Sequence, residues 1–406
     1  MRIIIYVLAL GLCSILNASA SDKWTFAEKI AITEKPVNGV FQHLEGGNRK
    51  HIAISPSYVA AVWEDDRTGD PQIYLALKQQ GEKKFSAAEM VSSASEAYEP
   101  AIANLPKNRF IITWEQDGMV FARVWADNIL QNAIQLSPSS AGHATVITMG
   151  EQIYVAWREQ FAREWFIKVA SLTVSDSSQL KLNHVQSVET KGLLTPVLFP
   201  ALTLNAAGLG VAWEDRRAGH TRLMFSHSID QAKYFIEPQF LNEFYSNRNE
   251  YDKGNGVTRV SMSSFSKDEI IAAWMDKRRG ENGYGIFGAM SSDGGASFGP
   301  NERIHSEQGD KLPHYNPATA GNLAGDFIVA WDDFRNESSD IWLSTYNDDL
   351  EWSEDFSPTI ASGAGEQTHP AVALDDQGNL HLIWMERSEA NSPGQLWYGL
   401  GARKSE

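Results

Sequence analysis

The sequence predicts an all-β fold, a seven-bladed β-propeller that occupies residues 21–406 as a single domain. Three observations favour it: a strand that ends in tryptophan returns seven times, each repeat has room for four short strands, and the strands at the two ends of the chain are incomplete. The 13 Trp, 31 Gly and 15 Pro suit short strands and tight turns better than a helical bundle. A six-bladed ring is the alternative, because the second and third repeats are closely spaced and weak.

The repeat is an apolar strand that ends in Trp and is followed by acidic and basic residues, as in Val59–Arg67. Successive tryptophans are 43 to 61 residues apart, which is typical of a propeller blade with four strands. We expect these aromatic side chains to fill the cores of the blades. The seven tryptophans are Trp63, Trp114, Trp157, Trp213, Trp274, Trp331 and Trp384.

The four strands of a repeat follow one another in a fixed order. The first begins at or near a Pro-Ala pair, as at Pro100–Ala101 and Pro370–Ala371. The second ends at the Trp, and the third follows the charged loop, as in Gln72–Ala76 and Asp340–Leu343. The fourth leads into the next repeat. Each repeat therefore predicts one antiparallel blade.

The two ends of the chain predict how the ring closes. Trp24–Ile30 has the pattern of a fourth strand, but no first three strands precede it. Gln395–Leu400 has the pattern of a third strand with no fourth after it. We expect the two segments to pair, because this completes the last blade and leaves only short sheet edges open.

The first residues are typical of a secretory signal peptide. Met1–Ala20 contains a basic Arg2, an apolar run over Ile3–Leu16 and a small-residue site at its end. The apolar run is too short to span a bilayer. We therefore expect cleavage after Ala20 and a secreted or periplasmic protein. A lipid anchor on Cys13 is the alternative, but Leu12 is large where a small residue is needed just before the modified cysteine. The single cysteine, Cys13, lies in this leader, so no disulfide is expected in the mature chain.

The charge of the chain narrows the class of partner. It has 35 Lys and Arg against 51 Asp and Glu, a net charge of −16. Such a surface repels phosphate backbones and anionic lipids, so neither nucleic acid nor a membrane is an expected partner. We expect a monomer without a cofactor, whose ligand is a carbohydrate or a protein. Because no metal-binding spacing is present, no metal site is predicted.

One segment matches a named motif. Ser291–Phe298 fits the Asp-box, Ser-x-Asp-x-Gly-x-Thr-Trp, with Ser and Phe as variants of the last two positions. Ser228–Phe235 and Asn347–Trp352 are degraded copies. With the repeated Trp phrase, these motifs make the chain resemble the sialidase-like Asp-box (BNR-repeat) β-propeller family. The resemblance covers about 375 residues by the repeat count, and it implies the fold more than an activity.

The resemblance also implies where to look for sialidase chemistry. Sialidases of this fold use an arginine triad, with one arginine in an Arg-Ile-Pro motif, a tyrosine nucleophile assisted by Glu, and an aspartate acid/base. The nearest stretch here is Asn48–Ile52, in which Lys50 and His51 follow Arg49 in place of Ile and Pro. The chain thus departs from the motif at both positions after Arg49.

The repeat itself separates two faces of the ring. If the Asp-boxes lie on one face, the loops after each Trp and before each first strand lie on the other face. They converge there on the mouth of the ring, where propellers commonly bind ligands. The Asp and Arg that recur after Trp, as Asp65 and Arg67 do, are expected to form ion pairs that tie one blade to its neighbour.

Residues that depart from the repeat are better candidates for function. The loop Asn242–Thr258 is the longest insertion, and long loops are often binding loops. Blade three has lost the usual Asp, so Arg158 has no obvious partner and is suited to an anion. The candidate ligand-binding residues are Arg49, His143, Arg158, Tyr251, Arg259, His314 and Tyr315.

Two functions remain open. The first is an interaction module that binds a glycan or a protein at the mouth without turnover. The second is a carbohydrate-active enzyme with its site in the same place. A glycoside hydrolase needs two carboxylates, which residues such as Asp276 supply, whereas a uronate lyase needs a base and an arginine. The candidate catalytic residues are Asp276, His143 and Tyr315.

Overall fold

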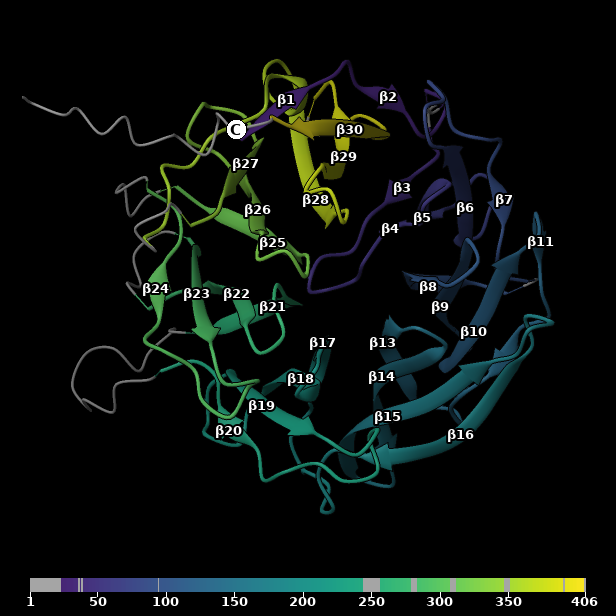
Figure 1. The fold of residues 1–406 in the computed structure, drawn as a ribbon, viewed down its shortest axis with the longest axis vertical. Coiled ribbons are helices and arrows are strands. Elements are labelled where there is room, and N and C mark those ends of the chain that lie inside the picture. Colours follow the sequence, from purple (N-terminus) through teal and green to yellow (C-terminus); the bar gives the residue numbers. More distant parts are fainter. Residues whose placement is uncertain are drawn as a thin grey trace, which may run out of the picture.

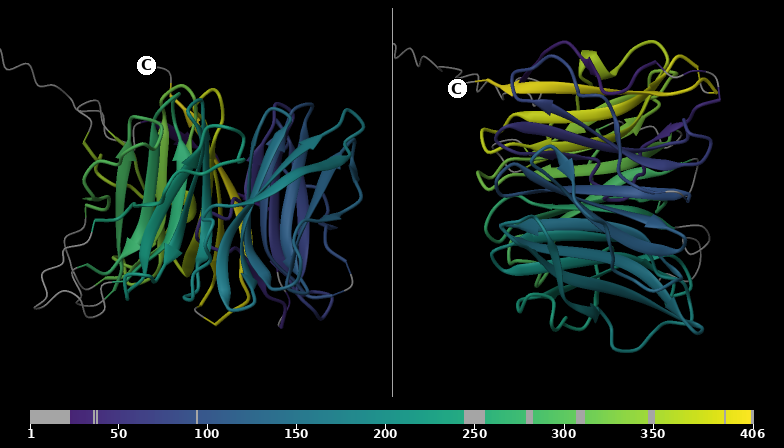
Figure 2. Two further views of the ribbon diagram at one scale, coloured as in Figure 1. Left: turned by 90° about the horizontal axis from the view of Figure 1, so that it is seen from below. Right: turned by 90° about the vertical axis from the view of Figure 1, so that its right-hand side faces the viewer.

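The computed structural model describes residues 23–404 except 36, 38, 94, 244–255, 279–282, 307–311, 347–350 and 390. Seven antiparallel sheets in these residues surround one axis (Figure 1). The predicted seven-bladed β-propeller is therefore confirmed, and the six-bladed alternative is wrong. Edge views show a thick disc of packed sheets (Figure 2). The only helix described is a 3-10 turn, Thr359–Ala361, and no helix in the described part is long and apolar enough to cross a membrane.

The first four blades follow the chain from its N-terminal part. Blade 1 contains β3 (Gln42–His43), β4 (Ile52–Ile54), β5 (Tyr58–Asp65), β6 (Gln72–Gln79) and β7 (Glu89–Met90). Blade 2 contains β8 (Ala97–Leu105), β9 (Arg109–Gln116), β10 (Met119–Ala126), β11 (Ile129–Leu130) and β12 (Ile134–Gln135). Blade 3 contains β13 (Ala141–Met149), β14 (Gln152–Phe161), β15 (Glu164–Val174) and β16 (Leu180–Ser187). Blade 4 contains β17 (Leu198–Asn205), β18 (Gly208–Asp215), β19 (Arg222–Ser228) and β20 (Gln239–Phe240).

The last three blades complete the circle. Blade 5 contains β21 (Val257–Ser264), β22 (Ile270–Asp276), β23 (Gly285–Ser291) and β24 (Glu302–Arg303). Blade 6 contains β25 (His314–Gly321), β26 (Phe327–Asp333) and β27 (Asp340–Ser344). Blade 7 contains β28 (Glu366–Leu374), β29 (Leu380–Arg387), β30 (Gln395–Arg403), β1 (Trp24–Phe26) and β2 (Ile30–Ala31).

The ring closes as predicted, by pairing the two ends of the chain. Both β1 and β2 lie antiparallel to β30, with Trp24 opposite Arg403 and Ile30 opposite Tyr398. Figure 1 shows the purple N-terminal strands beside the yellow C-terminal one. The expected single strand is interrupted between Phe26 and Ile30. The last blade therefore draws its outer edge from the first residues that the structure describes.

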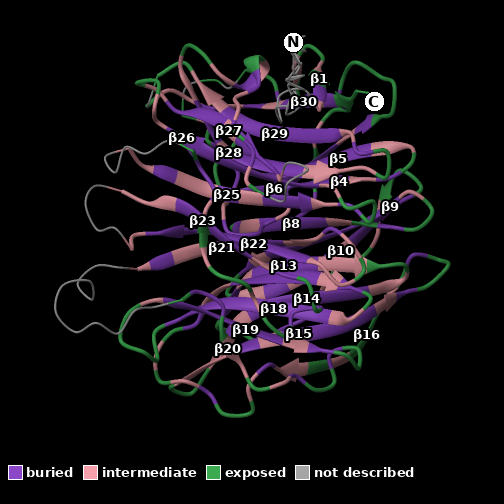
Figure 3. Cartoon of the chain, turned by 60° about the vertical axis from the view of Figure 1, so that its left-hand side comes forward, coloured by how far each residue is buried: buried purple, intermediate pink, exposed green. Residues whose placement is uncertain are grey.

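The tryptophans fill the blades, as expected, and the residue two positions later holds each of them. All seven side chains are buried, in strands that are buried along most of their length (Figure 3). The indole N–H of Trp274 donates to Asp276 Oδ2 at 3.0 Å, and Arg278 Nη2 lies 2.7 Å from the same oxygen. This Asp/Arg pair lies within one blade and fixes the indole. The expectation that the pair ties neighbouring blades together is therefore wrong here.

The turn after β23 lies at the end of the blade opposite the loop after Trp274. Asp293 Oδ1 accepts hydrogen bonds from Ser291 Oγ at 2.8 Å and from the Ser297 amide at 2.9 Å. The corresponding turn of blade 4 repeats this pattern with Ser228 and Asp230. Such side-chain bonds stabilise a tight turn, so the residues that carry the motif are structural.

A loop of blade 1 crosses the centre of the ring. It runs from Glu45 to His51, between β3 and β4, and Figure 1 shows it reaching the axis; we call it the axial loop. Asn48 Oδ1 accepts from the Met262 amide of blade 5 at 3.2 Å, and the Asn48 carbonyl accepts from Thr145 Oγ1 of blade 3 at 3.1 Å. These bonds to distant blades hold the axial loop between the two ends of the central channel.

Candidate functional site

The inner strands of six blades share one unusual backbone feature. Each has a β-bulge near its first residues, and one residue of each bulge has a left-handed φ between 48° and 59°. None of these residues is a glycine, so each conformation costs about 1–3 kcal/mol. Bulges re-aim side chains and are frequent beside active sites. The six residues are Glu99, His143, Phe199, Arg259, Asn316 and His369.

Acidic side chains hold several of these bulges. They come from the residue directly after Trp in the preceding blade, which faces away from the Trp because strand side chains alternate. Glu115 accepts the His143 amide at 3.0 Å, and Glu214 accepts the Arg259 amide at 2.8 Å. In blade 3 this position is Arg158, and the Phe199 amide donates instead to His143 Nδ1 at 3.2 Å.

Five blades contribute to one group of charged and aromatic side chains. Arg49 Nη2 lies 2.7 Å from Glu99 Oε2, and Arg259 Nη1 lies 2.7 Å from Glu45 Oε1. Side chains from so many blades can meet only close to the axis, and here they meet at the end where the loops after Trp lie. We call this group the mouth network. It consists of Glu45, Arg49, Glu99, His143, Phe199 and Arg259.

An aromatic ring lies at the centre of the mouth network. The imidazole of His143 stacks on the Phe199 ring with 4.1 Å between centroids. The guanidinium carbon of Arg259 lies 3.7 Å from the same centroid. A cation over an aromatic face is stabilised by the quadrupole of the ring. Phe199 thus holds a histidine and an arginine at fixed positions.

His143 is a neutral hydrogen-bond donor. Burial lowers its pKa to about 2, and the nearby Arg49, Arg158 and Arg259 act in the same direction. Its Nδ1 accepts the Phe199 amide, so the proton of the neutral ring is assigned to Nε2. This Nε2 lies 3.9 Å from Glu99 Oε1. At neutral pH the ring can therefore donate a hydrogen bond but carries no charge.

The carboxyl groups around the network differ in their affinity for protons. Burial raises the pKa of Glu64 to about 7, and the charges of Glu99 and Glu45 act in the same direction. Burial would also raise the pKa of Glu45, but its hydrogen bond to His43 and the charge of Arg259 hold it at about 2. Glu64 thus titrates near neutral pH, as a general acid or base must.

Arg158 is a cation near the mouth network that has no carboxylate partner at ion-pair distance in the described residues. It is half-buried, its guanidinium lies 5.2 Å from the Trp165 ring centroid, and it forms no ion pair within the described ranges. Its Nε has no hydrogen-bond partner in the structure. Arg158 stands directly after Trp157, where other repeats have an acid. Its guanidinium is therefore able to bind an anion.

Four of the predicted site residues lie together and three do not. Arg49, His143 and Arg259 belong to the mouth network, and Arg158 contributes to the electrostatic field at His143. His314 is buried instead, with its ring stacked on His305 at 4.0 Å and its Nε2 3.2 Å from Asp333. The prediction that His314 lies at the mouth is wrong, because its side chain, at the first position of β25, points into the blade.

Two other candidates lie apart from the network. Tyr315 is half-buried and packs edge-on against Tyr284 and Phe334. Asp276 is buried against Trp274 and Arg278, as described above. The structure brings neither of them to the mouth network. Tyr251 and most of its loop lie outside the described residues.

Sequence reasoning missed the acidic half of the site. Glu64 and Glu115 follow a Trp directly, and Glu99 precedes Pro100. Strand alternation was the available signal, since the residue after Trp must face away from it. The acid two positions after Trp, such as Asp276, was predicted as a candidate instead. In the structure this side chain binds the indole. No group of three or more His, Cys, Asp or Glu in the described part could hold a metal ion.

Comparison with known proteins gives the fold. No family model matches the chain, and no curated protein does. Among solved structures, the chain resembles a protein of unknown function from Dyadobacter fermentans, with a TM-score of 0.56 and 10% identity over 94% of this chain and 99% of that one. It also resembles the polysaccharide lyase Uly1, with a TM-score of 0.56 and 9% identity over 94% and 98%. The endosialidase of phage phi92 matches with a TM-score of 0.53 and 9% identity over 94% and 70%.

These likenesses concern the fold of the chain and not its activity. TM-scores of 0.53–0.56 over 94% of the chain, at identities of only 9–10%, establish the fold alone. Propellers of one architecture host unrelated activities. The activity of this chain must therefore be argued from its own side chains.

Proposed function

We propose that the protein binds an acidic carbohydrate at the mouth of the ring. The observation that carries the proposal is Arg158, a half-buried guanidinium without a carboxylate partner beside the neutral donor His143. In a chain with net charge −16, a local group of arginines is the feature that attracts an anion. Two of the similar structures are a polysaccharide lyase and an endosialidase, which supports a carbohydrate as the ligand class.

The three arginines would have different roles in binding. The side chain of Arg49 is fully buried and paired with Glu99, so it positions the network. Arg259 is 27% exposed and bound on one side by Glu45. Arg158 has its donors free, and a guanidinium binds a carboxylate through two parallel hydrogen bonds. A sugar acid would place its carboxylate on Arg158, with a hydroxyl near His143 Nε2.

Calorimetry with paired polysaccharides tests the proposal. The acidic polymers polygalacturonate and polysialate are titrated in parallel with neutral arabinan. We expect an acidic polymer to bind at least about tenfold more tightly than arabinan, because a charged hydrogen bond contributes about 1.5–3 kcal/mol. Arg158→Gln is expected to abolish that preference. Arg163→Gln, at an exposed arginine on the adjoining hairpin, is the matched control. Equal binding of acidic and neutral polymers would contradict the proposal.

A second candidate function is catalysis at the same mouth. The observation that favours it is Glu64, whose pKa of about 7 suits proton transfer to or from a sugar. A hydrolase would release reducing ends, whereas a uronate lyase would release products with an ultraviolet-absorbing double bond. If either product appears, Glu64→Gln should lower the rate by about 10²-fold or more. Binding without product leaves the first function.

We also propose that the protein acts outside the cytoplasm as a monomer. The support for export is the pattern of Met1–Ala20, which lies outside the described residues. Fractionation of expressing cells, with N-terminal sequencing of the recovered protein, is expected to place it in the periplasm or medium with Ser21 first. A cytoplasmic protein that retains Met1 would contradict export, and light scattering measures its mass.

A further inference from the structure

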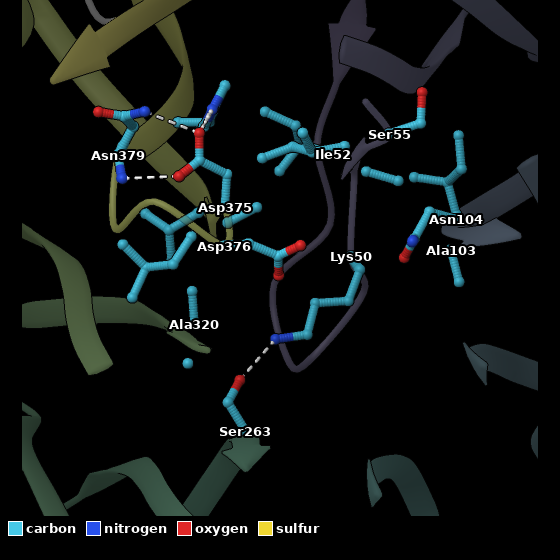
Figure 4. A pocket seen from close by; sticks show the side chains of 18 of the residues that line it. Lys50, Ile52, Ser55, Ala103, Asn104, Ser263, Ala320, Asp375, Asp376 and Asn379 are labelled. Carbon is cyan, nitrogen blue, oxygen red and sulfur yellow. Dashed lines mark hydrogen bonds and ion pairs between the residues drawn. The ribbon is translucent and has the colours of Figure 1, made fainter. Parts of the chain in front are cut away.

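A second cavity lies at the other end of the central channel, on the far side of the axial loop from the mouth network. Its volume is about 700 Å³, within the range of small-molecule sites. The inner strands supply much of its wall, with Ile54, Ala103, Ala320 and Leu374 among the lining residues. Figure 4 shows Lys50 reaching across this space from the axial loop.

Lys50 is a cation without a counter-charge. Its Nζ donates to Ser263 Oγ at 3.1 Å and to the Thr319 carbonyl at 2.6 Å, and both acceptors are neutral. Within the part of the chain that the structure describes, no carboxylate lies at ion-pair distance from it. Burial lowers the pKa of this ammonium to about 8. A charge in such surroundings is normally paired, because leaving it unpaired costs free energy.

The acidic residues of the cavity do not neutralise Lys50. Asp375 is already bound by Asn379, with its Oδ1 2.8 Å from the Asn379 amide and its Oδ2 2.9 Å from Nδ2. Asp376 is exposed and forms no ion pair with Lys50 in the described residues. The ammonium has a third N–H that neither Ser263 nor Thr319 accepts. The charge and this donor are both available to a ligand.

We propose that this cavity is a second binding site, which takes a small organic carboxylate with its anionic group on Lys50. One uncompensated positive charge matches one carboxylate better than a phosphate dianion, which is commonly bound by several donors. The aliphatic walls suit a short carbon chain, and the exposed carboxylate of Asp376 keeps a second acidic group of a ligand towards solvent. This site is independent of the proposed function at the mouth, because the axial loop lies between them.

Titration with succinate and with succinamide tests the site, since the two differ in charge but little in shape. Calorimetry is expected to detect binding of succinate and not of succinamide. Lys50→Met is expected to weaken succinate binding at least about tenfold, which is the ratio for a lost charged hydrogen bond. Arg158→Gln, at the other end of the channel, is expected to leave it unchanged.

Two further variants keep the test decisive if Lys50→Met does not fold. Ala320→Leu adds volume to the wall of the cavity while Lys50 remains, and it should block succinate. Lys50→Arg keeps the charge and should retain binding. The proposal is overturned if wild type does not bind succinate, if succinamide binds equally well, or if Ala320→Leu binds as wild type does. Loss of succinate binding in Arg158→Gln alone would assign the ligand to the mouth instead.

Discussion

Arg49 and Lys50 are consecutive residues whose side chains lie at opposite ends of the central channel. Arg49 pairs with Glu99 in the mouth network at 2.7 Å, whereas Lys50 donates to the Thr319 carbonyl beside the cavity at 2.6 Å. Neighbouring side chains of an extended segment point in opposite directions. One short axial loop, bonded to distant blades through Asn48, therefore presents a cation to each end.

Gly142→Ala is expected to weaken ligand binding at the mouth without unfolding the protein. A Cβ at this position would lie 2.3 Å from Glu115 Oε2, so Glu115 must move. That carboxylate accepts the His143 amide, and its displacement would shift the His143 ring. We expect about a tenfold loss of affinity for the acidic polysaccharide, which corresponds to about 1.4 kcal/mol.

Calorimetry and thermal unfolding of the same samples check this expectation. Gly299→Ala is the control, because a Cβ there meets only an ordinary contact at 3.5 Å and the backbone is not left-handed. Unchanged affinity in Gly142→Ala would mean that the position of His143 does not matter to the ligand.

Asp276→Asn is expected to destabilise the fold and to spare binding at the mouth. The substitution removes a buried charge that binds Arg278 at 2.7 Å and the indole of Trp274. Breaking such a pair costs about 3–5 kcal/mol when the remaining charge is buried, and less here because Arg278 is 22% exposed. We expect a loss of about 1–3 kcal/mol in the free energy of unfolding.

Urea unfolding measures that loss. Asp127→Asn, in an exposed turn with φ of 52°, is the matched control, since Asn also tolerates this conformation. A stable Asp276→Asn protein that has lost activity on a carbohydrate would instead return Asp276 to the catalytic candidates.

The ring can be predicted from sequence because its signals are periodic and redundant. Each Trp marks a blade, and the incomplete strands at Trp24–Ile30 and Gln395–Leu400 both indicate closure. No single position decides the result. The pairing of β1 and β2 with β30 confirms the closure of the ring.

The site is predictable only in part, because its geometry depends on contacts between blades. Arg158 can be found from sequence, since it replaces a repeated acid. Phe199 cannot, because its role follows from a left-handed φ of 48° that the bulge in β17 imposes. His314 shows the opposite failure: its position in the chain predicts a place at the mouth, but its ring stacks on His305 inside the blade.

Trp24→Ala tests how much ring closure contributes to stability. The Trp24 side chain is 5% exposed, and its indole donates to the Gly378 carbonyl at 2.9 Å. It also stacks on Phe356 of blade 6 with 6.3 Å between centroids. Truncating a buried aromatic side chain costs about 3–5 kcal/mol. We expect a loss of this size, measured by urea unfolding.

Phe41→Ala is the control for that variant, because Phe41 is 65% exposed and should change stability by less than about 0.5 kcal/mol. If the two variants were equally stable, the pairing of the two ends of the chain would contribute little to holding the ring.

Stability is expected to fall as the pH rises through the range in which Glu64 titrates. Burial raises the pKa of Glu64 from its ordinary value of 4.5 to about 7 in the folded protein. The folded state therefore holds this proton more tightly than the unfolded state does. The favourable contribution is complete below pH 4.5, declines as the pH rises, and is lost above about pH 7. Each pKa unit corresponds to about 1.4 kcal/mol, so a rise from 4.5 to about 7 corresponds to at most about 3.5 kcal/mol of stability.

Glu64→Gln removes this dependence, because glutamine has the shape of the protonated acid and does not titrate. Urea unfolding of both proteins at pH 5 and pH 8 checks it. We expect the loss of stability between these pH values to be smaller in Glu64→Gln than in wild type. Glu96→Gln, at an exposed carboxylate that accepts a hydrogen bond from Tyr98, should retain the wild-type difference. Identical pH dependence in all three proteins would mean that Glu64 is ionised in the folded state, and it would leave the mouth without a group suited to proton transfer.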